Sequence, residues 1–171
     1  MLFLNVNGWN EQELSLHFIG PVFTLAEISS HQYNLFANRQ IGAQIGEYYL
    51  TGKPDGMIAS GYREPEIPYF AFNEYKKEKD PDGDPAAQAL AAMLVGHQMN
   101  SDIRPLYGCY VIGQNWYFLA LENNRYAISP AYSALTDDLL FIFQRLKLLK
   151  AIVEQYVLQL PGTFAQTPTV A

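Results

Sequence analysis

Apolar residues recur along this chain in short segments that are separated by turn residues. The segment 69–76 is the clearest case, because an apolar stretch leads there into alternating polar and charged positions. Strands of this length alternate their side chains between two faces and are bounded by Gly, Pro, Asn and Asp. The turn residues at 51–54 predict that the first two strands form a hairpin. The pattern as a whole predicts strands over 44–50, 55–62, 69–76, 106–112, 116–121 and 126–129.

Three other segments have helical periodicity. Asp84 followed by Pro85 is a typical helix start, and it predicts a helix that runs to Asn100. Residues 11–28 predict one or two short helical pieces, because Gly20-Pro21 should break or kink a helix. Thr136 can cap a long C-terminal helix. Its apolar residues follow helical spacing and are Leu139, Phe143, Leu146, Val153, Tyr156, Val157 and Leu160.

The predicted elements follow the order helix, three strands, helix, strand, with additions after them. This order is typical of an α/β or mixed α+β protein in which helices cover a central sheet. A chain of 171 residues has the length of one domain, and it contains no internal repeat. We therefore predict a single domain over 1–160 and a frayed tail over 161–171.

Composition excludes several classes of protein. The formal net charge of −6 argues against broad, charge-driven binding of nucleic acid, but it leaves room for a local basic groove. Cys109 is the only cysteine, so we expect a small buried thiol, no disulfide and a cytoplasmic location. The N-terminal residues lack the features of a signal peptide, and no apolar run is long enough to predict a membrane span.

The segment 69–76 also carries unexpected charge. Strand alternation places Phe70, Phe72, Glu74 and Lys76 on one face. If the phenylalanines are buried, a carboxylate and an ammonium lie side by side in a partly dry place. Such burial costs desolvation free energy unless a ligand or a partner charge offsets it.

Asp55 opens the strand before this one, and neighbouring strands could bring it close to Glu74. The repulsion between two such carboxylates is relieved by a shared proton or by a cation. Mg²⁺ typically takes one or two protein carboxylates together with water and phosphate oxygens. Lys76 could then position a water or stabilise negative charge on a phosphate. The alternative is that Asp55 is an exposed turn residue and that Glu74 forms an ordinary salt bridge with Lys76 or Lys77.

The sequence Pro54-Asp55, followed after 18 residues by Glu74-Tyr75-Lys76, resembles the PD-(D/E)xK nuclease superfamily. The resemblance extends over residues 10–120 and includes the order helix, three strands, helix, strand. The segments EYKKE, DPDGDP and LYGCYVIGQNWYF are similar to those of a group of uncharacterised bacterial proteins assigned to this superfamily. The resemblance to the superfamily implies a restriction-endonuclease-like core, which is a central mixed β-sheet flanked by helices. In this chain the long C-terminal helix would follow that core.

The resemblance implies a metal-dependent nuclease with named site residues. Asp55 and Glu74 would hold Mg²⁺ or Mn²⁺, and Lys76 would act on the attacking water and the phosphate. Gln88, early in the helix after the lysine strand, would steady the site or contact the phosphate. Glu13 would supply a further metal ligand from the first helix. Its possible substitutes are Glu11, Glu27 and Glu47.

The implied substrate is nucleic acid, with DNA favoured over RNA. Because the domain is small and acidic, we expect it to form a homodimer or to bind a protein partner. Two alternatives stay open. The chain could be a catalytically inactive protein that keeps the nuclease fold as a binding or interaction module, or a metal-dependent hydrolase of another substrate.

Overall fold

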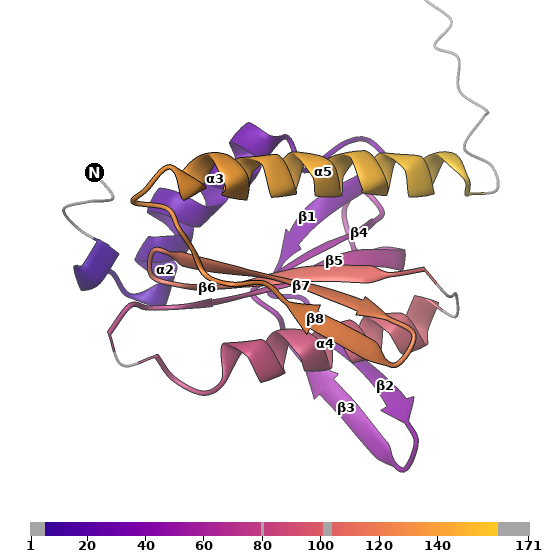
Figure 1. Ribbon diagram of the computed structural model, residues 1–171. Helices are drawn as coiled ribbons and strands as arrows, with labels where there is room; N and C mark the ends of the chain where they lie inside the picture. Colours follow the sequence, from indigo (N-terminus) through magenta and orange to yellow (C-terminus); the bar gives the residue numbers. More distant parts are fainter. Residues whose placement is uncertain (1–5, 80, 101–103, 161–171) are drawn as a thin grey trace, which may run out of the picture.

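The computed structural model describes residues 6–79, 81–100 and 104–160. A central mixed β-sheet lies between two layers of helices (Figure 1), which confirms the predicted mixed α/β class and the long C-terminal helix. The described part of the sheet has the strand order β1-β4-β5-β6-β7-β8, and β9 also pairs with β7. The strands are β1 (Tyr33–Ala37), β4 (Gly56–Ser60), β5 (Glu66–Lys76), β6 (Leu106–Ile112), β7 (Asn115–Glu122), β8 (Arg125–Ile128) and β9 (Tyr132–Ser133).

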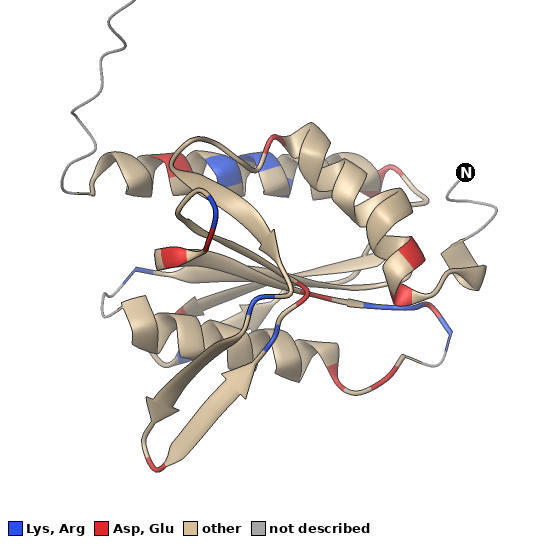
Figure 2. Ribbon diagram, turned by 180° about the vertical axis from the view of Figure 1, so that it is seen from behind, with Lys and Arg blue, Asp and Glu red and all other residues tan. Residues whose placement is uncertain are grey.

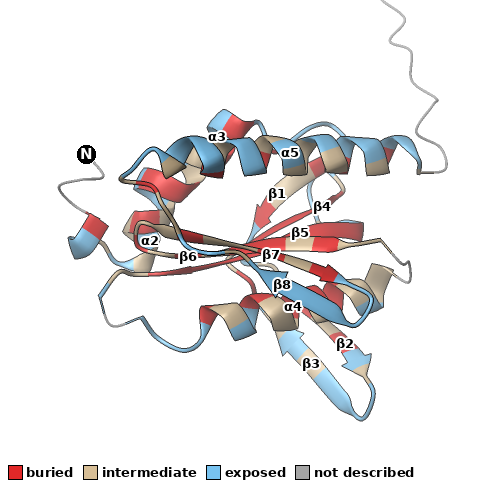
Figure 3. Ribbon diagram, in the orientation of Figure 1, coloured by how far each residue is buried: buried red, intermediate tan, exposed pale blue. Residues whose placement is uncertain are grey.

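Helices cover both faces of this sheet. One face packs against α2 (Glu11–Leu14), α3 (Gly20–Ala26) and α5 (Asp138–Leu158), with Trp116 fully buried at the centre of that core. The other face packs against α4 (Pro85–Asn100). The most buried parts of the chain therefore follow the middle strands (Figure 3).

The strand that carries the predicted site is held on both sides. β5 pairs antiparallel with β4 and parallel with β6, and α4 is the crossover that a parallel pair requires. Gly96 of α4 lies against the ring of Phe72 in β5, so closely that a Cβ at this position would overlap the ring. The distance between α4 and β5 therefore depends on this glycine.

A bulge changes which residues of β5 share a face. The register between β4 and β5 shifts at Phe70. The Phe70 ring lies on the α5 side of the sheet, with its centre 6.5 Å from that of the Tyr156 ring. Phe72 packs on the α4 side instead. The prediction that Phe70 and Phe72 share a face is therefore wrong, because an extra residue in one strand reverses the alternation there.

The predicted strand over 44–50 is also wrong. Those residues belong to a separate hairpin, β2 (Ile41–Ile45) and β3 (Tyr48–Gly52), which packs against α4. Gly46 and Glu47 form its turn, and Gly46 has φ 59°. A glycine at the first central position is what a two-residue type II′ turn needs. Gly-Glu is not one of the common turn pairs, which is why the pattern hid this turn.

The hairpin predicted between 44–50 and 55–62 does not form either. β4 pairs with β5 and with β1, a strand that the sequence pattern did not predict. The β2–β3 hairpin is an insertion between β1 and β4. The N–H of Asn38 donates a hydrogen bond to the carbonyl of Asp55 at 3.2 Å, so the two ends of this insertion are held together.

Gly20-Pro21 does not break the first helical region. The chain is helical from Glu11 to Ala26, with a π-helical segment over Ser15–Ile19 between α2 and α3. The Gly20 N–H accordingly donates to the carbonyl of Ser15, five residues earlier. The wider π turn is a known way to accommodate a disturbance within a helix.

The long C-terminal helix begins close to its predicted start. Its N-cap is Asp137 rather than Thr136, although the Thr136 hydroxyl does accept the N–H of Asp138 at 3.3 Å. Leu139, which we predicted on the apolar face, is 40 % exposed. The buried residues of α5 are Ile142, Leu146, Val153 and Val157. The predicted tail 161–171 lies outside the described residues.

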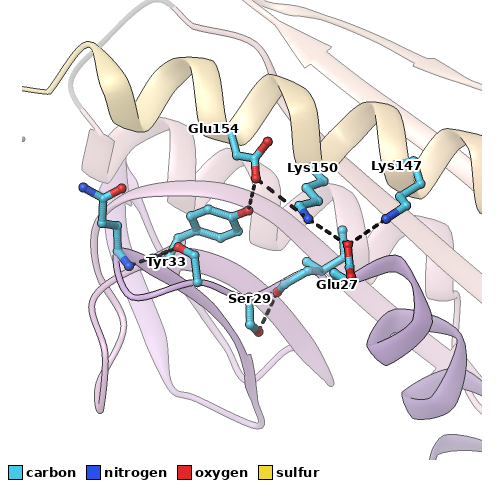
Figure 4. Close-up of polar contacts among 9 residues, drawn as sticks. Glu27, Ser29, Tyr33, Lys147, Lys150 and Glu154 are labelled. Atoms are coloured by element: carbon cyan, nitrogen blue, oxygen red, sulfur yellow. Dashed lines mark hydrogen bonds and ion pairs between the residues drawn. The ribbon is translucent and has the colours of Figure 1, made fainter.

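Polar contacts fasten α5 to the sheet and to α3 (Figure 4). The Glu27 carboxylate accepts hydrogen bonds from Lys147 at 2.9 Å and Lys150 at 3.1 Å. These two lysines, Lys147 foremost, lower the pKa of Glu27. The Tyr33 hydroxyl donates to Glu154 at 3.4 Å, and burial followed by the Glu154 charge raises the pKa of Tyr33 to about 12.

Candidate functional site

Asp55 and Glu74 come together where β4 begins and β5 nears its end. Gly56 pairs with Asn73 in the β4–β5 ladder, so the residues just beyond this pair are neighbours. The Tyr75 N–H donates to Asp55 Oδ2 at 2.7 Å. The backbone of Asp55 in turn stabilises the Glu74 carboxylate, which has a small lowering effect on the pKa of Glu74. The Asp55 carboxylate is therefore held by the backbone of the neighbouring strand.

Lys76 completes this group. Its Nζ donates to Glu74 Oε1 at 3.1 Å and lies 3.7 Å from Glu11 Oε1. The side chains of Lys76 and Glu74 are only 9 % and 10 % exposed. Lys77 instead forms a salt bridge with Asp82, with 3.9 Å between Nζ and Oδ2. The Glu74–Lys76 salt bridge that the alternative interpretation predicted is thus present, and it is buried.

The environment raises the pKa of both carboxyl groups. Burial raises the pKa of Asp55 and of Glu74, and the Asp55 charge raises that of Glu74 further. Burial alone would lower the pKa of Lys76, but its hydrogen bond to Glu74 and the surrounding negative charges raise it overall. Lys76 therefore stays protonated. The charges of Asp55 and Glu74 beside it repel each other. A further cation would relieve that repulsion.

Asp55→Asn is expected to raise the melting temperature of the metal-free protein by about 1–4 °C near neutral pH. Because folding raises the pKa of Asp55, the folded state binds the proton more tightly. The stability that protonated Asp55 contributes is therefore lost as the pH rises from the pKa of Asp55 in the unfolded state through its pKa in the folded state. At neutral pH this contribution is absent. Asparagine removes the charge but keeps an oxygen for the Tyr75 N–H. Scanning calorimetry in EDTA measures the change.

The exposed Asp82 supplies the control for this prediction, since its side chain is 89 % exposed. Asp82→Asn should leave the melting temperature nearly unchanged. The gain from Asp55→Asn should shrink as the pH falls and the wild-type carboxyl becomes protonated. A lower melting temperature for Asp55→Asn at neutral pH would show that the carboxylate stabilises the fold instead.

Gln88 shares with Glu74 a cleft of about 210 Å³, which Lys53 also helps to line. The start of α4 positions it: Asp84 Oδ1 accepts the Ala87 N–H at 3.0 Å, as the predicted helix cap requires. The structure therefore brings Gln88 and Glu74 to one cleft.

Glu13, the predicted ligand from the first helix, is used elsewhere. Its Oε2 accepts the Asn10 N–H at 2.9 Å, and Asn10 Oδ1 accepts the Glu13 N–H at the same distance. This capping box begins α2. The pattern Asn-x-x-Glu in the sequence is itself a signature of such a box and could have predicted this role.

The substitutes for Glu13 differ in position. Glu11 is the one that reaches the site, through its contact with Lys76. Glu27 pairs with the lysines of α5, and Glu47 lies in the turn between β2 and β3. Across the part of the chain that the structure describes, no three His, Cys, Asp or Glu side chains gather closely enough to hold a metal ion.

The donor set still fits a hard divalent cation. Two neighbouring carboxylates with raised pKa values are a net acidic pair, and Mg²⁺ commonly takes one or two protein carboxylates with water and phosphate oxygens. Asp55 and Glu74 are the residues that would hold it.

A larger cavity, of about 350 Å³, lies on the α5 side of the sheet and is mostly apolar. Cys109 borders it as a buried thiol, as predicted, and donates to Asn73 Oδ1 at 3.3 Å. Burial raises the pKa of this thiol, so it is not poised as a nucleophile. Glu74 therefore lines a separate, smaller and more polar cleft, whereas Asp55 lines another cavity together with residues of the first helical region.

The sequence matches no family model, no curated protein and no solved structure. Fold and site alone define the class: a mixed α/β protein with a central mixed sheet flanked by helices, in which a half-buried carboxylate meets a buried carboxylate–lysine pair at adjacent strand ends. No helix among the described residues is long and apolar enough to cross a membrane.

Proposed function

We propose that this protein is a cytoplasmic nuclease that hydrolyses phosphodiester bonds, with DNA favoured as substrate and with Mg²⁺ or Mn²⁺ as cofactor. One observation carries the proposal: the half-buried Asp55 meets the buried pair of Glu74 and Lys76 at neighbouring strand ends, where Glu74 lines a cleft. The element order also supports the resemblance to the PD-(D/E)xK superfamily. A helical region precedes the adjacent strands β1, β4 and β5, and α4 then leads to β6.

The residues of the site have separate roles in this proposal. Asp55 and Glu74 would hold the metal, which when bound polarises the phosphate and makes a coordinated water more acidic. Lys76 remains protonated beside Glu74, so its Nζ can donate to the attacking water or to a phosphate oxygen. Water adds to phosphorus as the ester P–O bond breaks, and the leaving oxygen ends protonated. Gln88 can donate to the phosphate from the opposite wall of the cleft.

One observation favours the alternative, a binding module that does not cleave. Glu13 is committed to the helix cap, so the site has two carboxylates for a metal rather than three. Two are enough for Mg²⁺ when the substrate supplies phosphate oxygens. The site therefore still supports a nuclease best, and a protein that binds metal or nucleic acid without cleaving it is the alternative that the cleavage test distinguishes.

The test is incubation of the purified protein with plasmid, linear duplex and single-stranded DNA in Mn²⁺, Mg²⁺ or EDTA. We expect cleavage in the presence of metal and none in EDTA. A protein with Asp55→Ala and Glu74→Ala, prepared in parallel, controls for a contaminating nuclease. Failure of the wild type to cleave any of the three substrates would leave the binding module as the better proposal.

A further inference from the structure

The tip of the β2–β3 hairpin exposes two neighbouring tyrosines. Tyr48 is 74 % exposed and Tyr49 is 66 % exposed. At the other end of the hairpin, Ile41 and Ala43 are buried in the core that includes α4. The hairpin projects beyond α4 and away from the central sheet (Figure 1), which leaves its tip open to a partner.

Tyr48 lies on the side of the hairpin that faces the cleft. Alternation along β3 places it on the same face as Leu50, which lines the cleft with Glu74 and Gln88. Tyr49 lies on the opposite face, with its ring over Gly42. The five residues of β3, from Tyr48 to Gly52, lead outward from the cleft over about 14 Å.

Charge near the hairpin is sparse (Figure 2). Residues 41–52 contain a single charged residue, Glu47, and the basic residues Arg39 and Lys53 flank them. Arg39 contacts Glu64 at 3.6 Å, while Lys53 lines the cleft. Few cations mean few phosphate contacts, which are the main source of affinity for duplex DNA. Stacking of an unpaired base on an aromatic ring can replace them, because it strengthens binding by about 5- to 150-fold per base.

We propose that Tyr48 is a stacking platform for an unpaired nucleobase, and that the cleft therefore takes single-stranded nucleic acid. The proposal rests on the proposed function, because it assigns a substrate class to the cleft that Glu74 lines. Within a duplex each base face is covered by the next base, so only an unpaired base has a face free for Tyr48.

The test measures binding apart from cleavage. Fluorescence anisotropy of a fluorescein-labelled oligothymidine strand, titrated with protein in EDTA, gives the affinity of wild type and variants. Tyr48→Ala should weaken binding about tenfold, and Tyr48→Phe should preserve it, because the ring stacks. Tyr126→Ala removes a tyrosine of β8 that is 59 % exposed and should have no effect. The same strand annealed to its complement should bind more weakly than the single strand.

Equal affinity of wild type and Tyr48→Ala overturns the proposal, and so does a duplex that binds as tightly as the single strand. Absence of binding by the wild type overturns it as well. These results are separate from those of the cleavage test. If the wild type cleaves DNA and Tyr48→Ala binds the strand as tightly as the wild type does, the nuclease proposal stands and the stacking proposal is wrong. If binding depends on Tyr48 but the wild type never cleaves DNA, the stacking proposal stands and the nuclease proposal is wrong.

Discussion

Lys76→Met is expected to slow metal-dependent cleavage by about 100- to 1000-fold while Mn²⁺ binding is retained or strengthened. Lys76 is the buried cation beside Glu74, 3.1 Å from its Oε1. Its removal takes away the positive charge that would stabilise the transition state. The same removal eliminates a charge that repels the metal, so the carboxylates should attract Mn²⁺ more strongly. Calorimetric titration with Mn²⁺ and steady-state cleavage of single-stranded DNA measure the two effects independently.

The neighbouring lysine is the matched control. The Lys77 side chain is 36 % exposed and contacts Asp82 rather than the site. Lys77→Met should therefore change neither cleavage nor Mn²⁺ binding by more than a small factor. If Lys76→Met lost metal binding in proportion to cleavage, the lysine would serve to hold the carboxylates in place. Normal cleavage by Lys76→Met would remove it from the mechanism.

Gly96→Val is expected to destabilise the fold by roughly 2–3 kcal/mol and to lower the melting temperature by about 5–10 °C. Gly96 is buried where α4 meets β5, and a side chain there would overlap the ring of Phe72. Phe72 is fully buried, so the helix must move away from the strand or the ring must leave its rotamer. Urea unfolding followed by circular dichroism measures the loss.

Gln98→Val controls for the cost of a β-branched residue in the same helix, because Gln98 is exposed. It should cost only a few tenths of a kcal/mol. The Gly96 substitution should also impair cleavage in the folded fraction, since it displaces α4 and with it Gln88 from Glu74. Equal stability of the two variants would mean that α4 packs more loosely on β5 than the structure indicates.

Local signals predicted much of this fold. Asp84-Pro85 marked the start of α4, and the apolar run over 106–112 coincides with β6. Gly46 and Phe70 show why other parts were missed. The turn at Gly46 uses an uncommon pair of residues, and the bulge at Phe70 arises from pairing between β4 and β5. No local pattern in a single strand reports on such pairing.

The same distinction applies to the site. Asp55, Glu74 and Lys76 meet because β4 and β5 are neighbours, which the general preference for adjacent strands predicted. The acid from the first helix could not be chosen in this way. Glu11 and Glu13 are only two residues apart, and the choice depends on which of them the Asn10 cap takes.

The insertion that carries β2 and β3 closes on itself, since Asn38 and Asp55 are hydrogen-bonded at its base. Its length can consequently change without moving the carboxylate that follows it. The residues that would choose the substrate and those that would carry out the chemistry could then evolve separately. The hairpin could be lengthened, shortened or exchanged, while the strand ends that hold Asp55 and Glu74 stay constant.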